Sequence, residues 1–330
     1  MNPEQIITNT AGITSIAAIW LYAISNIWKR KQALITGIAL AVMLVSFFSV
    51  SGALVLRGIE ASRFPVANMY ESLLLFAWGL QVAFLVLDHK LKLAQIGWLA
   101  AACVSSVFLY ASWLPPDQQS IQPLMPALVS YWRAIHVPPL MFSYALLVLA
   151  GLVSVVHLFK INRTTTGYGC LAAVAVSAAS IGLGSTNTAT QTQVQMLFWG
   201  GTALTLIFIA FALKSEWSRD IPSSELIDRL DDTCQRCISF AFPLLTFGII
   251  TGAFWANHAW GSYWSWDPKE SMSLVTWLFY ATYLHIRSKF DDRPDLMAVI
   301  AVTGLLATLL TYLGFNFLGF GGLHSYGQIR

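Results

Sequence analysis

Tryptophan is the residue type that gathers most densely in this sequence. The chain has 13 tryptophans, and four of them lie with one tyrosine in the twelve residues that end at position 266: Trp255, Trp260, Tyr263, Trp264 and Trp266. An aromatic belt at a membrane surface is one interpretation. The density, with small glycine and serine residues between the rings, favours a flat aromatic surface for a large planar ligand, with indole N–H groups donating at its polar edge.

Acidic residues close this tryptophan segment, which we define as residues 255–270. Asp267, Pro268 and Glu270 have the spacing of a capping box. Aspartate is a good N-cap, proline suits the first helical position, and a glutamate three residues after the cap reaches back to the cap's N–H. This structural role explains both acids, and direct contact with a ligand is the alternative.

Two histidines stand at the edges of apolar stretches, in Trp132-Arg-Ala-Ile-His136-Val-Pro-Pro and in Gly321-Gly-Leu-His324-Ser-Tyr326-Gly. Two imidazoles that meet over an aromatic surface are suited to bind a haem iron from its two axial sides. Taken alone, either histidine is explained by a hydrogen bond to the backbone at a membrane interface. The haem site requires that the fold place His136 and His324 on the same face as the tryptophan segment.

His285 is set apart from this group. It follows Pro268 by 17 residues, which is about 26 Å along a helix. It therefore lies near the opposite membrane interface, where two interpretations are open. Ionisable groups at membrane depth are candidates for function, but a histidine this close to Arg287 is also explained as a residue that extends to the interface.

The remaining candidates are weaker. Cys234 and Cys237 form a CxxC, but Ile238 follows where haem attachment would need a histidine, and no further zinc ligands are nearby. We therefore expect both cysteines to be structural. His258 lies inside the tryptophan segment, and its role is left open between tuning the aromatic surface and a place in a hydrated loop.

The elements that must position these residues are membrane helices. The chain has 330 residues, of which 56% are hydrophobic and 11% charged, and its mean hydropathy is +0.63. A soluble surface needs more charge than this, and a net charge of +3 gives no footprint for nucleic acid. Eight stretches are long and apolar enough to span a bilayer: 11–28, 34–56, 69–87, 93–113, 136–159, 239–256, 271–287 and 296–318. The fold class is therefore all-α, a polytopic bundle of about 8–10 transmembrane helices.

Two further apolar stretches, 168–184 and 196–213, form either a ninth and tenth span or an interfacial hairpin. Both alternatives return the chain to the side it left. The charged, amphipathic segment 214–238 is expected as a surface helix. The N-terminus lacks the basic region and cleavage site of a signal peptide, so residues 11–28 are expected to be a retained first span.

Basic residues set the orientation of this bundle. Loops on one side carry 14 lysines and arginines, and loops on the other carry 5. The richer side is expected to be cytoplasmic, so both termini face outward. His136, His324 and the tryptophan segment then lie on the outer, periplasmic or lumenal, face.

These residues resemble a known family. Trp260-Gly-Ser-Tyr-Trp264-Ser-Trp266-Asp267-Pro-Lys-Glu is similar to the tryptophan-rich WWD motif of haem-handling proteins, and the whole chain resembles the CcsA-type cytochrome c biogenesis proteins of system II. Further matches are Phe64-Pro-Val-Ala-Asn68-Met-Tyr70-Glu71-Ser72, His136-Val-Pro with Ser143-Tyr144, Tyr283-Leu-His285, and Gly322-Leu-His324-Ser-Tyr326-Gly. They run from about residue 58 to the C-terminus, which implies N-terminal transmembrane helices over 1–57 and a haem-handling transmembrane domain over 58–330. The apolar pair at 168–213 is a departure, because about eight spans are expected in such proteins.

The resemblance implies a set of roles. His136 and His324 match the family's external pair of histidines, the axial ligands of haem b, with Trp260, Tyr263, Trp264 and Trp266 around the porphyrin. His285 matches a transmembrane histidine on the inner part of the haem route. No side chain is assigned as a certain catalytic acid or base.

The resemblance also implies partners and a place in the cell. With a CcsB-type membrane subunit, such a protein is the haem-binding part of a cytochrome c synthase that joins haem to the CxxCH cysteines of an apocytochrome c. Thiol-reducing thioredoxin-like proteins keep those cysteines reduced. Membrane lipid surrounds the chain, in a bacterial inner membrane or a cyanobacterial thylakoid membrane.

Two other functions fit part of these observations. One is a CcmC-like protein that presents haem to a carrier, although such chains are shorter and have fewer spans. The other is a transporter whose aromatic surface binds a lipid-like or quinone ligand without iron. It would show no haem absorption and would not need His136 or His324.

Overall fold

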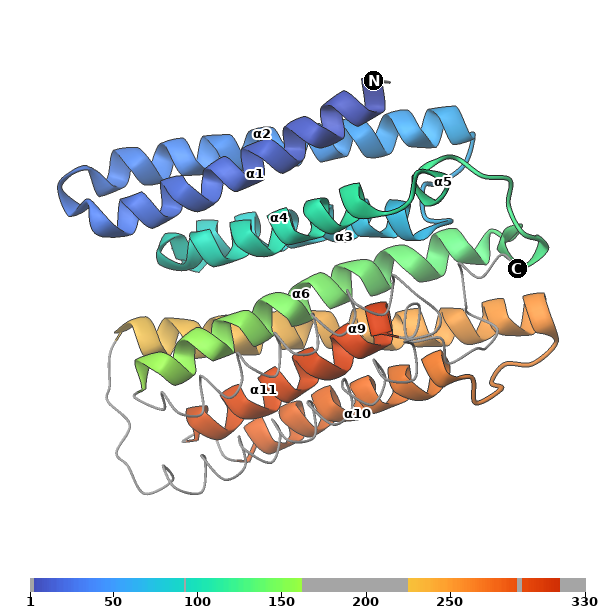
Figure 1. The fold of residues 1–330 in the computed structure, drawn as a ribbon. Coiled ribbons are helices and arrows are strands. Elements are labelled where there is room, and N and C mark those ends of the chain that lie inside the picture. Colours follow the sequence, from blue (N-terminus) through green and yellow to red (C-terminus); the bar gives the residue numbers. More distant parts are fainter. Residues whose placement is uncertain (1–2, 92, 162–224, 290–292, 315–330) are drawn as a thin grey trace, which may run out of the picture. The chain divides into compact units, whose positions relative to one another are not determined.

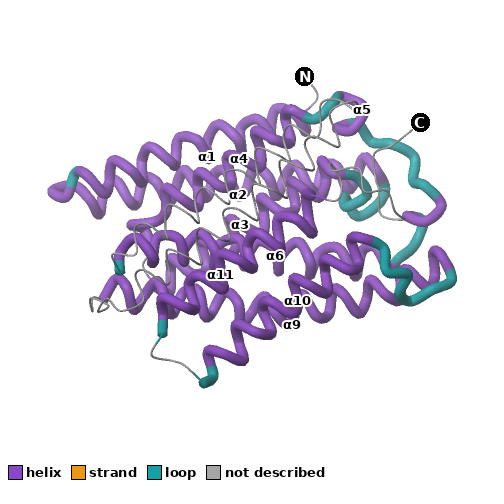
Figure 2. The backbone as a smooth tube through the Cα atoms, turned by 60° about the horizontal axis from the view of Figure 1, so that its bottom comes forward, coloured by secondary structure: helices purple, strands orange, loops and turns teal. Residues whose placement is uncertain are grey.

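The computed structural model describes residues 3–91, 93–161, 225–289 and 293–314. Within these ranges the chain is helical and has no β-strand, which confirms the expected all-α class. Figure 2 shows the helices as purple coils joined by loops. His324 and the apolar pair at 168–213 lie outside the described residues.

In the described ranges, eight long helices overlap the eight predicted spans, some with different ends (Figure 1). With one short helix between α4 and α6, they are α1 (Pro3–Ile27), α2 (Gln32–Ala61), α3 (Met69–Leu91), α4 (Gly97–Trp113), α5 (Pro116–Gln119), α6 (Trp132–Lys160), α9 (Glu225–Trp260), α10 (Pro268–Arg287) and α11 (Pro294–Leu309). Six of them, α1, α2, α3, α6, α9 and the α11 region, are long and apolar enough to cross a membrane. The chain is an integral multi-pass membrane protein.

Helix α9 differs from its prediction. Residues 225–238, expected in a separate surface helix over 214–238, continue without a break into the predicted span, so that one helix of 36 residues results. Ion pairs of Glu225 with Arg229 and of Asp232 with Arg236 have the i,i+4 spacing that supports a helix. The charged segment is therefore the first part of the spanning helix.

The chain divides into two compact units, and the division falls within α6 and α9. The first unit holds Met1–Leu149 and Phe247–Tyr263, and the second holds Ala150–Thr246 and Trp264–Arg330.

In the first unit α1 packs against α2 and α4 through small residues and hydrogen bonds. Ser46 Oγ donates to the carbonyl of Ala11 at 2.8 Å, and the hydroxyls of Ser15 and Ser105 are 2.8 Å apart. Gln81 Nε2 of α3 donates to Ser46 Oγ at 3.0 Å. Small residues let apolar helices approach closely, and polar side chains then bond across them.

A buried ion network holds one end of this unit together. The Arg57 side chain, 2% exposed, donates through Nε to Glu71 at 3.1 Å and through one terminal nitrogen to both oxygens of Glu4. Its other terminal nitrogen donates to the carbonyl of Gln119 at 2.7 Å, and Arg63 pairs with Glu71 from the loop after α2. Helices α1, α2 and α3 and the short helix α5 are thereby joined by charge-assisted hydrogen bonds.

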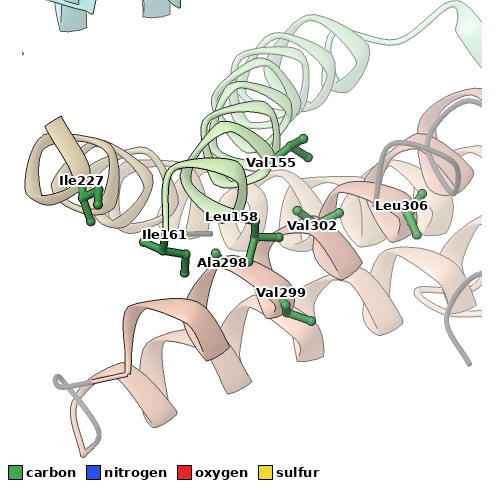
Figure 3. Packing of buried hydrophobic residues seen from close by; sticks show 8 residues of the cluster. All are labelled: Val155, Leu158, Ile161, Ile227, Ala298, Val299, Val302 and Leu306. Atoms are coloured by element: carbon green, nitrogen blue, oxygen red, sulfur yellow. The ribbon is translucent and has the colours of Figure 1, made fainter. Parts of the chain in front are cut away.

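The second unit has an apolar core between α6, α9 and α11. Figure 3 shows its members: Val155, Leu158, Ile161, Ile227, Ala298, Val299, Val302 and Leu306. Gly151 allows the closest approach, because a Cβ there would lie 2.5 Å from Leu305 Cβ. On the other side of α11, Tyr280 and Thr276 of α10 meet the hydroxyls of Thr308 and Thr311 at 3.1 and 2.8 Å.

Candidate functional site

The first unit holds His136 in a defined tautomer. His136 lies in the first turns of α6, and its Nδ1 is 2.7 Å from the carbonyl oxygen of Gly248 in α9. A carbonyl oxygen only accepts, so Nδ1 must carry the proton. Nε2 is then the nitrogen that carries the lone pair. Histidines that bind metals in proteins usually donate their other N–H in this way, which fixes the ring and raises its basicity.

Two glycines of α9 make room for this ring. Gly248 and Gly252 have GxxxG spacing, the pattern that lets apolar helices approach closely. A Cβ at Gly252 would lie 2.6 Å from His136 Cε1 and 2.8 Å from its Nδ1. A Cβ at Gly248 would lie 2.3 Å from Leu140 Cδ2, one turn further along α6. The histidine therefore sits against bare helix backbone, and any side chain at position 252 would displace it.

Aromatic rings extend from His136 to the end of α9. The ring centroid of Trp255 lies 5.6 Å from that of His136 and 6.0 Å from that of Trp260. Trp255 is 3% exposed, and its Nε1 donates to the carbonyl of Ala127 at 2.9 Å. It therefore supports the ring of His136 from within the unit, while Trp260 is half-buried at the helix end.

A second row of rings runs beside the first. Trp132, one turn before His136 in α6, stacks on Phe254 with a centroid distance of 5.3 Å and an interplanar angle of 12°. Phe254 in turn meets Tyr263 edge to face at 5.8 Å. Tyr263 is 55% exposed, so this row ends in a ring that is open to a ligand.

The second unit presents Trp266 on an unusual backbone. Its φ is 57°, in the left-handed region that residues with a side chain seldom adopt. Glu270 Oε2 accepts from the backbone N–H groups on both sides, from Ser265 at 2.8 Å and from Asp267 at 3.3 Å. The indole is 71% exposed. A strained residue that the surrounding hydrogen bonds hold in place is typical of a functional position.

The same contacts form the capping box that the sequence predicted. Asp267 accepts from Lys269 N at 3.0 Å, Glu270 bonds back to the cap, and Pro268 occupies the first turn of α10. The structural role of both acids is thus confirmed. Burial lowers the pKa of Lys269 to about 8, an effect that the neighbouring carboxylate of Asp267 partly offsets.

The expectation of a flat aromatic surface is wrong for the two pairs of rings that the structure describes within the tryptophan segment. Trp264 and Trp266 meet at 87° with centroids 5.9 Å apart, and Trp255 and Trp260 are inclined by 36°. The rings prefer edge-to-face contact because the positive edge of one is attracted to the negative face of the other. Such rings offer a ligand both edges and faces.

His285 lies where its spacing predicted, in the last turn of α10. Its side chain is exposed and continues the exposed face of α10 that carries Leu278, 50% exposed, and Val275, 37% exposed. Helix α10 runs without a break from Pro268 to Arg287, as the predicted spacing requires. Its role in a haem route stays a prediction.

The cysteine pair belongs to the interior of the second unit. Cys234 and Cys237 are free thiols and buried, and Ser154 Oγ donates to Cys234 Sγ at 3.1 Å. Buried structural cysteines are unreactive. Within the described ranges, no group of three or more His, Cys, Asp or Glu side chains is placed to hold a metal ion. His258 is exposed in the last turn of α9, and its role stays open.

Several contacts of His136 escaped the sequence reasoning. Gly248, Gly252 and Trp255 belong to α9, more than a hundred residues after His136, and nothing local links them to it. The GxxxG spacing within an apolar stretch was the one signal that pointed to a close helix contact at this position. In the sequence Trp132 stands out only as a neighbour of His136, whereas in the structure it starts the second row of rings.

Comparisons with known proteins agree along nearly the whole chain. The model of a family described as Cytochrome C assembly protein matches residues 66–323. A protein of Gloeothece citriformis named cytochrome c biogenesis protein CcsA is 34% identical over 332 residues, which cover 99% of this chain and 98% of the relative. Proteins with the same name are 40% identical over 276 residues in Pyropia yezoensis, with 81% and 79% covered, and 34% identical over 332 residues in Synechocystis, with 98% and 97% covered.

Proposed function

Because the chain belongs to the CcsA family of cytochrome c biogenesis proteins, we propose that it binds haem b on the outer face of the membrane and delivers it to apocytochrome c. In this proposal a CcsB-type subunit completes the cytochrome c synthase, and the haem becomes covalently attached to the cysteines of a CxxCH sequence. Haem is the substrate of the reaction. The relatives are named for a role in cytochrome c biogenesis. The assignment of particular residues to haem binding is part of our proposal.

The hydrogen bond of His136 to Gly248 is the observation that carries this proposal. It fixes the tautomer in which Nε2 has the lone pair for iron, at 2.7 Å between Nδ1 and the carbonyl oxygen. The ring lies close against the backbone of Gly252, where a Cβ would be 2.6 Å from Cε1. His136 is thus prepared as an axial ligand before haem arrives, and His324 is the second ligand in this proposal.

The aromatic residues have a different task. Trp260, Tyr263, Trp264 and Trp266 would contact the apolar porphyrin, with Tyr263 and Trp266 the most exposed of the four. The backbone clamp of Glu270 on Trp266 keeps one indole in place without a ligand. Such preorganisation lowers the entropy lost on binding.

The attachment step adds a thiol across a vinyl group. The cysteine sulfur bonds to the vinyl carbon next to the ring, the thiol proton goes to the terminal carbon, and no group leaves. Both cysteines must be reduced, which is the task of thiol-reducing thioredoxin-like proteins. The chain's contribution is to hold the vinyl edge toward the apocytochrome, and positioning alone is worth about 7–11 kcal/mol of a barrier.

Maturation of a reporter cytochrome tests the proposed function. The chain is expressed with a CcsB-type subunit and a CxxCH apocytochrome in cells without a maturation system of their own, and covalent haem is measured by haem staining after denaturation. Wild type should yield stained cytochrome, and His136→Ala should not. Equal staining with the two forms would refute the role of His136, and a wild-type chain that purifies without haem absorption would favour the non-haem transporter.

His285 requires a separate measurement because we place it on the route and not in the outer site. We expect His285→Ala to purify with less haem than wild type. Haem added to the outer face should still bind with unchanged affinity. If the affinity for added haem falls instead, His285 belongs to the outer site or to the fold that supports it.

A further inference from the structure

A cavity in the first unit lies between α1 and α4, away from the candidate haem site. It has a volume of about 410 Å³, which is within the range of about 300–1,000 Å³ of small-molecule sites. Helix α1 supplies one wall, α4 supplies another, and Tyr70 of α3 and Gln119 of α5 close one end. His136 and the tryptophan segment contribute nothing to its lining.

The lining changes character along the cavity. Gln5 and Asn9 place amide groups at one end beside Gln119, whose Nε2 donates to the carbonyls of Ser112 and Leu114. Ile13 and Ile16 continue the same wall two to three turns further along α1. The distance between the levels of Gln5 and Ile16 is about 16 Å along the helix. The hydroxyl of Ser105 also lines the second end, where it bonds to Ser15 and to the carbonyl of Ala101. The cavity therefore has a hydrogen-bonding end and a mainly apolar end, the arrangement that fits a polar head with an apolar tail.

The apolar end opens sideways. Ile13 is 68% exposed, Leu109 of α4 is 60% exposed, and both line the cavity. In a membrane, exposed side chains of spanning helices face the acyl chains. A ligand tail can therefore enter between α1 and α4 from the bilayer without passing through water.

The hydrogen-bonding end carries no net charge. Of the described residues that line the cavity, none is charged. Arg57 lies close behind Tyr70, 4.8 Å from that ring, but its Nε and both of its terminal nitrogens are bound to carboxylates of Glu4 and Glu71 and to the carbonyl of Gln119. A phosphate headgroup would find no cation, whereas a neutral head with carbonyl oxygens would find amide donors.

We propose that this cavity binds an isoprenoid quinone. The quinone ring is neutral, its carbonyl oxygens accept hydrogen bonds from the amides of Gln5 and Asn9, and Tyr70 and Phe108 offer aromatic contacts. The single tail lies along Ile13, Ile16 and Leu109. A volume near the lower end of the ligand range suits one tail better than the two tails of a phospholipid. The proposal concerns binding and assigns no electron transfer.

Gly12 offers a way to fill the cavity without disturbing the helices. It lines the cavity, and a Cβ there would meet Phe108 Cβ at 3.5 Å, an ordinary contact. A leucine in place of glycine favours the helix by about 1 kcal/mol, and its longer side chain extends into the cavity. Gly37 is the matched control, since it is helical in α2 with nothing within 4 Å of its Cβ position.

Photolabelling of the full chain in phosphatidylcholine nanodiscs tests the proposal. The probe is an azidoquinone with a decyl tail, and labelled peptides are identified by mass spectrometry. We expect label on α1 and α4, competition by decylubiquinone, and at least a tenfold loss of label in Gly12→Leu but not in Gly37→Leu. Asn9→Leu should weaken binding about 2- to 12-fold, the worth of one hydrogen bond.

Three outcomes would overturn it. Unchanged labelling in a folded Gly12→Leu variant would place the quinone elsewhere. Equal competition by decylbenzene, which has no carbonyl oxygens, would show that the cavity recognises only an apolar tail. Equal competition by phosphatidylglycerol would show that it is a phospholipid site. If Gly12→Leu does not fold, Ile16→Phe fills the cavity from its apolar end, and the same loss of label is expected in that variant. Haem binding should be unchanged in all these variants, so the result is independent of the proposed function.

Discussion

The contact between His136 and Gly252 yields the sharpest prediction. In Gly252→Ala the new Cβ would lie 2.6 Å from His136 Cε1, which is about 0.8 Å closer than the ordinary contact limit of 3.4 Å. The imidazole ring cannot simply turn away, because rotation would break the hydrogen bond from Nδ1 to the Gly248 carbonyl at 2.7 Å. Either the ring shifts or α6 moves away from α9.

The size of the effect follows from this overlap. Overpacking by one methyl group costs about 1–3 kcal/mol. If this free energy is needed to return the imidazole ring to the position in which it binds haem, haem affinity falls about 5- to 150-fold. The helix itself does not suffer, because alanine favours a helix over glycine by about 1 kcal/mol. A loss of haem without a loss of folded protein is therefore expected.

The assay is a titration of haem into the purified apoprotein, followed by absorption. Gly37→Ala is the control, because the same change in α2 meets nothing within 4 Å. We expect weaker haem binding in Gly252→Ala and wild-type binding in Gly37→Ala, with folded, helical protein in both by circular dichroism. Wild-type haem affinity in Gly252→Ala would refute the assignment of His136 as a ligand held against α9.

Three further predictions concern the segment around Trp266 and the ion network. Glu270→Ala should destabilise the start of α10 by about 1 kcal/mol and weaken haem binding in the same titration. Glu270→Gln keeps an acceptor oxygen and should retain most of the helix stability and most of the haem affinity. Equal effects of the two substitutions would argue against the clamp on Trp266. The pKa of Lys269 is about 8, so the rate of its modification by an amine-selective reagent should reach half its maximum near pH 8, against about 10.4 for an ordinary lysine. Asp267→Asn keeps a good N-cap but removes the charge that raises this pKa, so the midpoint should move to lower pH; a midpoint near 10 in wild type would contradict the burial. Arg57→Met leaves the buried carboxylate of Glu4 without its cation and Glu71 with Arg63 alone. It should lower the free energy of unfolding by about 3–5 kcal/mol, measured by thermal unfolding in detergent; an unchanged midpoint would show that the network contributes nothing.

The elements could be predicted from the sequence because their causes are local. Apolar length predicted eight helices, six of which are long and apolar enough to cross a membrane, and the order of Asp267, Pro268 and Glu270 predicted the start of α10. Each depends on residues within one helix or one turn, where periodicity and capping chemistry act directly. The start of α9 was missed because charge suggested a surface helix, whereas i,i+4 ion pairs extend the spanning helix through that charge.

The contacts within the site could not be predicted, because they join distant parts of the chain. His136 and Gly248 are 112 residues apart, and only packing of α6 on α9 brings them together. The left-handed backbone of Trp266 was also hidden, since such positions are usually recognised by a glycine, and here a glutamate side chain holds a tryptophan there. The orientation of the rings depended on edge-to-face contacts that composition does not reveal.

The coordination of iron in the haem-loaded chain is the most direct test of the central claim. Electron paramagnetic resonance of the oxidised, purified protein distinguishes iron with two histidine ligands from iron that has lost one. We expect a low-spin spectrum in wild type and its loss in both His136→Ala and His324→Ala. A wild-type spectrum that persists in His136→Ala would contradict the account.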